Sequence, residues 1–101
     1  MAKPVKDKAE VSIDFPEKFY MGGFSRDSTF EARVENDGLF IRLLRPGDDK
    51  REVEMHIHHK LLADILTEWA ASITREPPMD KDHRDTLLAA LGKVEKALKR
   101  R

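Results

Sequence analysis

Residues 52–65 change their hydrophobic periodicity halfway along, and this change constrains the fold more than any other feature of the sequence. Val53, Met55 and Ile57 alternate with polar residues, which is typical of a strand with one apolar face. From Leu61 onward, apolar residues recur every three or four positions, which is typical of an amphipathic helix. The sequence therefore predicts a strand that leads directly into a helix.

Two earlier segments show the same alternation. Their apolar residues are Phe30, Ala32 and Val34 in the first segment and Leu39, Ile41 and Leu43 in the second. Between them, Asp37-Gly38 predicts a tight hairpin turn, because these residue types tolerate the positive φ angles of such turns. A second turn runs from Pro46 to Lys50. The pattern predicts an antiparallel meander of three strands.

Both predicted turns bring the apolar residues together on one face of the sheet. The first turn would place Val34 opposite Ile41, and the second would place Ile41 opposite Met55. A slip of one residue would turn these side chains to the other face, so the agreement supports the meander. We expect the odd-numbered side chains of 39–43 and 53–57 to point into the protein.

The N-terminal part of the chain is less regular. We expect residues 1–9 to form a flexible tail and residues 10–101 to form a single domain. A fourth strand is predicted where alternation resumes before Pro16, at Val11, Ile13 and Phe15. In Phe19–Phe24, two glycines interrupt an apolar run, which predicts a loop or a bulged strand.

Two amphipathic helices are predicted after the sheet. Their apolar stripes are Leu61, Leu62, Ile65, Leu66, Trp69 and Ile73 in the first, and Leu87, Leu88, Leu91, Val94 and Leu98 in the second. The first should end near Thr74, before the break at Pro77-Pro78. Asp80 or Asp82 can cap the second by accepting from its free N–H groups. We therefore predict an α+β fold in which both helices pack on the apolar face of the sheet.

Composition limits the possible classes of protein. The chain has 101 residues, and its 19 basic and 19 acidic residues cancel, so no net field attracts it to nucleic acid or membranes. Cysteine is absent, which excludes disulfides and favours an intracellular location. The N-terminus lacks the apolar core of a signal peptide, and no apolar run is long enough to span a bilayer. We expect a soluble cytoplasmic protein without membrane contacts.

The polar face of the predicted sheet carries an unusual group of residues. Phe40 and Leu44 flank Arg42 on the central strand, and Glu54 and His56 lie on the next strand with the same parity. An aromatic residue and an arginine at the centre of an exposed patch are frequent anchors of protein interfaces. We predict that Phe40, Arg42, Leu44, Glu54 and His56 bind a protein partner or a second copy of the chain.

His56 and His58 offer an alternative. Two positions apart on a strand, they leave the same face about 7 Å apart at Cα, which suits two imidazole ligands of one metal ion. Glu54 could be a third ligand. The simpler interpretation is that these are polar residues on a solvated face, so the main prediction contains no metal site. A metal- or small-ligand-binding domain that uses His56 and His58 is the alternative function.

Binding of single-stranded nucleic acid ranks third, and catalysis is not predicted. The polar face shows one aromatic residue, and its carboxylates would repel phosphate. No serine lies in a nucleophile-elbow pattern, and no cofactor-binding motif is present. We expect a small non-catalytic accessory or interaction protein without a cofactor.

Overall fold

The computed structural model describes residues 2–76 and 80–100, and the chain forms two compact units that divide after Ile65. The first unit contains the strands and the second contains most of the helical residues. The predicted α+β class, with antiparallel sheets and two C-terminal helices, is confirmed. The single domain, and the packing of the helices on the sheet, stay predictions.

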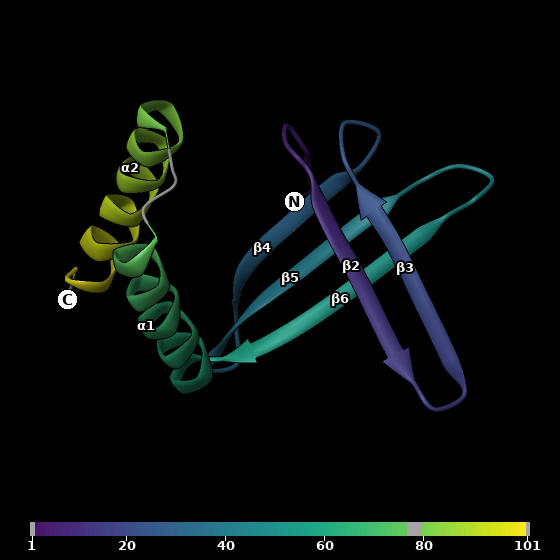
Figure 1. Cartoon of the computed structure of the whole chain (residues 1–101), viewed down its shortest axis with the longest axis horizontal. Coiled ribbons are helices and arrows are strands. Elements are labelled where there is room, and N and C mark those ends of the chain that lie inside the picture. Colours follow the sequence, from purple (N-terminus) through teal and green to yellow (C-terminus); the bar gives the residue numbers. More distant parts are fainter. Residues whose placement is uncertain (1, 77–79, 101) are drawn as a thin grey trace. The chain divides into compact units, whose positions relative to one another are not determined.

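The strands form two antiparallel sheets (Figure 1). Their bounds are Lys3–Pro4 (β1), Ala9–Phe15 (β2), Lys18–Phe24 (β3), Thr29–Glu35 (β4), Gly38–Arg45 (β5) and Arg51–His58 (β6). A four-stranded sheet has the order β1-β4-β5-β6, and β2 and β3 form a two-stranded ribbon. The predicted meander is therefore β4-β5-β6, and the predicted fourth strand, which ends before Pro16, is β2.

The predicted register of the β4–β5 hairpin is wrong by two residues. The turn is formed by Asn36 and Asp37, whose φ angles of 40° and 54° are both positive, as in a type I′ turn. Val34 therefore lies opposite Leu39 rather than Ile41. The apolar face survives this correction, because a shift of two residues keeps every side chain on its own face.

Gly38 shows why the turn lies one residue earlier than predicted. It occupies the first position of β5, where a Cβ atom would lie 2.6 Å from both His56 Nε2 and the Ile57 carbonyl oxygen. Only glycine fits this position without displacing β6. Asn and Asp are the non-glycine residues that best tolerate positive φ, so Asn36 and Asp37 can make the turn itself.

The predicted β5–β6 register is confirmed. Leu43 lies opposite Val53, Ile41 opposite Met55, and Leu39 opposite Ile57. The connecting turn covers residues 46–50, as predicted, and contains Gly47 with a φ of 114°. The apolar face of the sheet therefore consists of Phe30, Ala32, Val34, Leu39, Ile41, Leu43, Val53, Met55 and Ile57.

Phe19–Phe24 is neither a loop nor a bulged strand. It belongs to β3, which pairs with β2 residue by residue, without an insertion. Gly22 makes room for the Tyr20 ring, and a Cβ atom there would also lie 2.9 Å from the Arg51 guanidinium. The glycine therefore permits close approach between the ribbon and β6, rather than breaking the strand.

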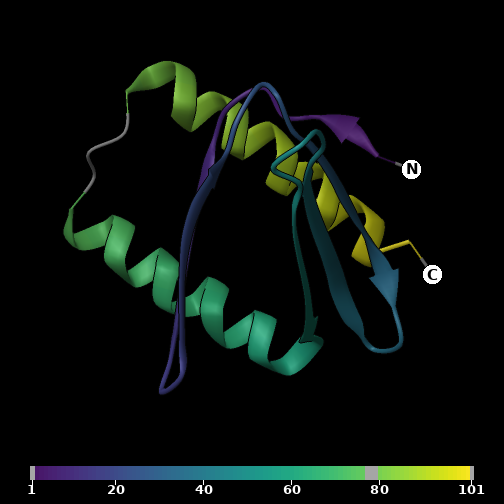
Figure 2. The ribbon, with the colours of Figure 1, turned by 90° about the vertical axis from the view of Figure 1, so that its right-hand side faces the viewer.

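The ribbon meets the four-stranded sheet near the end of β3. Phe24 is fully buried there, and Ser28 is 2% exposed. Figure 2 shows the ribbon and the sheet close together at this end and apart at the other. Residues 1–9, expected to be a flexible tail, contain β1, and the Val5 N–H donates to the Ser28 carbonyl at 3.0 Å.

The apolar face of the sheet is covered unevenly. One part of it, with Phe30 and Leu43, lines a hollow of about 650 Å³ together with residues 3–9. Elsewhere on this face, Val34 is 78% exposed and Met55 is 46% exposed. The strands of the first unit therefore do not by themselves bury the inward-pointing residues that the sequence predicts.

Both helices follow β6 in the chain. Helix α1 (His59–Arg75) follows β6 with no residue between them, as the periodicity predicts, and α2 spans Lys81–Leu98. Asp80 is the N-cap of α2, where its side chain accepts from the His83 N–H at 2.9 Å, which confirms one of the two predicted caps. The predicted break at Pro77-Pro78 lies outside the described residues. Neither described helix has the length and apolar character needed to cross a membrane.

Candidate protein-contact face

The five predicted contact residues lie together on one face of the four-stranded sheet. Strand pairing sets Phe40 opposite His56 and Arg42 opposite Glu54, while Leu44 continues the same side of β5. We call this surface the charged face. It consists of Glu31, Arg33 and Glu35 from β4, Phe40, Arg42 and Leu44 from β5, and Glu52, Glu54, His56 and His58 from β6.

Arg33 covers the aromatic ring at the centre of the charged face. Its guanidinium carbon lies 4.2 Å from the centroid of Phe40, which is the geometry of a cation–π contact. The same guanidinium donates to Glu31 Oε2 at 2.5 Å and to Glu35 Oε2 at 2.6 Å. The hydrogen bond to Glu35 is the main cause that raises the pKa of Arg33 above its ordinary value. The charge over Phe40 is therefore permanent and held in place.

Alternation with Ala32 and Val34 places Arg33 on this face, but it does not indicate the contact with Phe40. The predicted register would have set it opposite Arg42, whereas the observed register sets it opposite Phe40. The two positive φ angles at Asn36 and Asp37 cause this difference. An Asn-Asp-Gly run in which both Asn and Asp can adopt positive φ is the feature that could have suggested the correct pairing.

Arg42 lies between two carboxylates on β6. Its Nε atom is 2.8 Å from Glu52 Oε2 and 3.9 Å from Glu54 Oε2, so the diagonal neighbour is closer than the directly opposite one. The Glu52 contact satisfies the distance for an ion pair, but it lacks the geometry of a hydrogen bond, since this buried Nε has no hydrogen-bond partner. The contact with Glu54, the residue directly opposite Arg42, is therefore the weaker of the two.

The charged face carries more negative than positive charge. Its four carboxylates come from Glu31, Glu35, Glu52 and Glu54, and its two cations come from Arg33 and Arg42. Arg33 lies between two carboxylates of its own strand, β4, and Arg42 lies near two carboxylates of β6. A surface with this excess favours a positively charged partner.

The two histidines of the charged face contact each other. The ring centroids of His56 and His58 are 4.6 Å apart, at an interplanar angle of 44°. His56 Nε2 lies 2.8 Å from the Glu35 carbonyl oxygen, and it must be the donor, because a carbonyl only accepts. Within residues 2–76 and 80–100, no three His, Cys, Asp or Glu side chains form a metal-binding group. The metal alternative at His56 and His58 stays a prediction.

No family model, curated protein or solved structure matches this chain significantly. The functional interpretation therefore depends on the geometry and charge of the face alone.

Proposed function

We propose that this protein is a non-catalytic interaction protein that binds a basic segment of another protein through the charged face. The observation that carries the proposal is the strand register, which gathers Phe40, Arg42, Leu44, Glu54 and His56 into one contiguous patch. Aromatic and arginine side chains frequently dominate the binding energy of protein interfaces. A surface of this kind binds a partner through several side chains at once and needs no catalytic residue.

Preorganisation supports this role. Two carboxylates and the Phe40 ring hold the Arg33 guanidinium, while Arg42 lies between Glu52 and Glu54. Side chains that are already ordered lose little conformational entropy when a partner binds. Phe40 and Leu44 are half-buried, so a partner would complete their burial rather than create it. These features favour binding in which the charged face keeps the conformation that it has in the free protein.

The charge excess indicates the chemistry of the partner. Two copies of the charged face would bring like charges together, which disfavours self-association through this surface. Phosphate groups would be repelled for the same reason, which disfavours nucleic acid. Lysine or arginine side chains of a partner, by contrast, could pair with carboxylates such as Glu54, whose side chain is 55% exposed.

The test compares variants on the two faces of the sheet. The double variant Phe40→Glu/Arg42→Glu alters the charged face, and Val34→Glu adds a charge to the opposite face at a residue that is already 78% exposed. The probe is a synthetic peptide of alternating lysine and leucine, and amide chemical shifts report where it binds. We expect shifts at residues of the charged face, lost in the double variant and kept in Val34→Glu.

Either of two results would contradict the proposal. The peptide could perturb only residues outside the charged face, or the two variants could bind it equally well. Cross-linking in a cell extract then identifies the natural partner. Its cross-linked segment should be rich in lysine or arginine, and its capture should weaken as the salt concentration rises.

A further inference from the structure

On one side of α2, the order of acidic and basic residues is complementary to the same order read backwards. Six residues recur at intervals of four, four, three, four and four, and they run from the N-cap to the C-cap of the helix. They are Asp80, Arg84, Leu88, Leu91, Glu95 and Lys99. With 3.6 residues per turn they lie within a stripe about 100° wide. We call this set the α2 stripe.

The order of charges on the α2 stripe is acid, base, two leucines, acid, base. Read from the other end, the order is base, acid, two leucines, base, acid. An antiparallel copy that places Leu88 opposite Leu91 therefore also places Arg84 opposite Glu95 and Asp80 opposite Lys99. Every charge meets its opposite, and each contact occurs twice because a two-fold interface repeats it.

We propose that two copies of this chain associate through antiparallel contact of their α2 stripes. The dimer uses the helical unit, and it is independent of the binding proposed for the charged face. Charge complementarity indicates that a second copy of the chain is the partner of the α2 stripe. In the antiparallel arrangement, each of the six positions faces a leucine or a charge of the opposite sign. Antiparallel helix pairs of this kind occur at the centre of four-helix bundles.

The apolar centre of the α2 stripe lies at an open groove. Leu88 is 60% exposed and Leu91 is 43% exposed. Both line a hollow of about 390 Å³ between α1 and α2, and Trp69 and Ile73 line it from α1. Arg84 lines the same hollow and is the one charged residue among its described lining residues. A helix face that presents two leucines and a carboxylate at the position of Glu95 complements this lining, and the α2 stripe of a second copy presents these groups.

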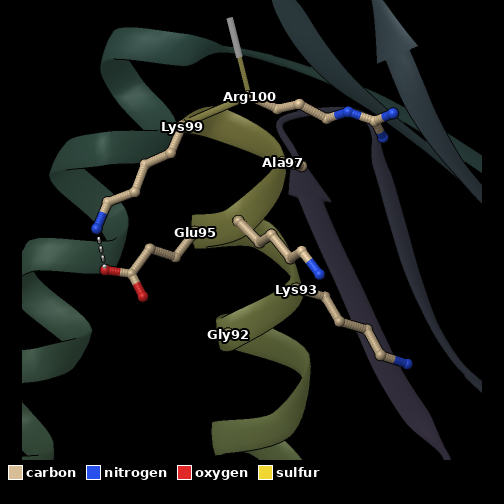
Figure 3. Close-up of a pocket in the computed structure, with 7 residues that line it drawn as sticks. Gly92, Lys93, Glu95, Ala97, Lys99 and Arg100 are labelled. Atoms are coloured by element: carbon tan, nitrogen blue, oxygen red, sulfur yellow. Dashed lines mark ion pairs between the residues drawn. The ribbon is translucent and has the colours of Figure 1, made fainter.

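The ends of the stripe are arranged for a charge network. Glu95 and Lys99 form an ion pair at 3.2 Å, and Figure 3 shows that Lys93 and Arg100 extend in other directions. In the antiparallel dimer, the Glu95–Lys99 pair of one copy faces Arg84 and Asp80 of the second copy. Four alternating charges then lie at each end of the interface, while Lys93 stays in solvent.

The first experiment reverses the charges of the stripe. Sedimentation across a series of protein concentrations should detect the wild-type dimer. Arg84→Glu alone and Glu95→Arg alone each convert two attractive contacts into two repulsive ones, so each should weaken dimerisation by about tenfold. The double variant Arg84→Glu/Glu95→Arg should restore it. Lys93→Glu makes the same charge change as Arg84→Glu outside the stripe, and it should have little effect.

The second experiment tests the antiparallel orientation. The chain contains no cysteine, so a cysteine introduced at one position is the only one present. When Leu88→Cys and Leu91→Cys chains are mixed and oxidised, a disulfide should link the two different chains in preference to two identical ones. A parallel pair would give the opposite preference, because it aligns each position with itself.

Three results would overturn the proposal. They are a wild-type chain that stays monomeric at every concentration, a double charge variant no better than either single variant, and preferential linkage of identical chains. Circular dichroism of each variant checks that α2 is still helical. Phe40→Glu/Arg42→Glu should leave dimerisation unchanged, so failure of this proposal and failure of the proposed function are distinguishable.

Discussion

The first unit, which contains the strands and is called the β unit below, differs from the helices in how far it buries its side chains and pairs them with one another. In the β unit, Phe24 is fully buried, and the arginines of the charged face contact side chains of neighbouring strands: Arg33 lies over the Phe40 ring, and Arg42 pairs with Glu52. Neither α1 nor α2 buries a single described residue. Strand pairing brings together side chains that are distant in the chain, whereas an isolated helix forms only its own backbone hydrogen bonds. The β unit therefore has a buried centre and fixed charged side chains, although part of its apolar face stays exposed, while the helices leave most of their apolar stripes open for association.

The largest expected effect comes from removing the buried side chain. Phe24→Ala should destabilise the protein by about 3–5 kcal/mol, because it leaves a cavity where the ribbon meets the sheet. Leu88→Ala, at an exposed site of α2, should change the stability of the dilute chain by only about 0.5 kcal/mol. Urea unfolding followed by circular dichroism measures both. Equal costs for the two variants would contradict the distinction between the units.

Glycine substitutions should give effects of opposite sign in the two regions. Gly38→Ala should destabilise by about 1–3 kcal/mol, since its Cβ would press on His56 and on the Ile57 backbone. Gly92 lies inside α2, and a Cβ there meets no atom within 4 Å. Gly92→Ala should therefore stabilise by about 0.5–1 kcal/mol, because alanine favours a helix. Thermal unfolding of the two variants tests whether the signs differ.

The smallest expected effect is a pH dependence in the β unit. A hydrogen bond from Ser28 Oγ is the main cause that holds the pKa of Asp27 below its ordinary value, and attraction by Arg45 adds to it against the opposing effect of burial. A carboxyl whose pKa is lowered on folding stabilises the protein above its ordinary pKa. This contribution is lost as the pH falls through the lowered value.

Acid unfolding measures this dependence. Asp27→Asn should reduce the loss of stability between neutral pH and strongly acidic pH, relative to the wild type. Ser28→Ala should act in the same direction, because it removes the hydrogen bond that lowers the pKa. An unchanged acid profile in Asp27→Asn would show that this carboxyl does not couple folding to pH. The effect should be small, since the Asp27 side chain is 54% exposed.

Much of the charged face could be predicted because side-chain parity along a strand is a local property. Alternation between apolar and polar residues assigned Phe40, Arg42 and Leu44 to one face, and the length of the 46–50 turn set the β5–β6 register correctly. The contact between Arg33 and Phe40 could not be predicted in the same way. It depends on which two residues of the Asn-Asp-Gly run form the turn, and that choice depends on space beside β6.

The buried centre of the β unit was the least predictable part. Phe24 follows two glycines, so local pattern indicated a loop or a bulge, yet the segment is a regular strand that ends in the most buried hydrophobic residue described. Gly22 is one of the two glycines that predict a loop or a bulge, but in the structure it allows the Tyr20 ring and Arg51 to approach. Close packing between separate strands could not be predicted, because no pattern of neighbouring residues in the sequence indicates it.

By itself, the sequence determined β2, β4, β5, β6 and both helices, the polarity of their faces and the α2 stripe, because each depends only on spacing along one strand or one helix. It did not determine β1 or β3. The tertiary structure decided the β4–β5 register, the burial of Phe24 and the stacking of Arg33 on Phe40. These three features depend on the space that is available between neighbouring strands. Excluded volume between residues far apart in the chain is the physical reason that only the folded structure could settle them.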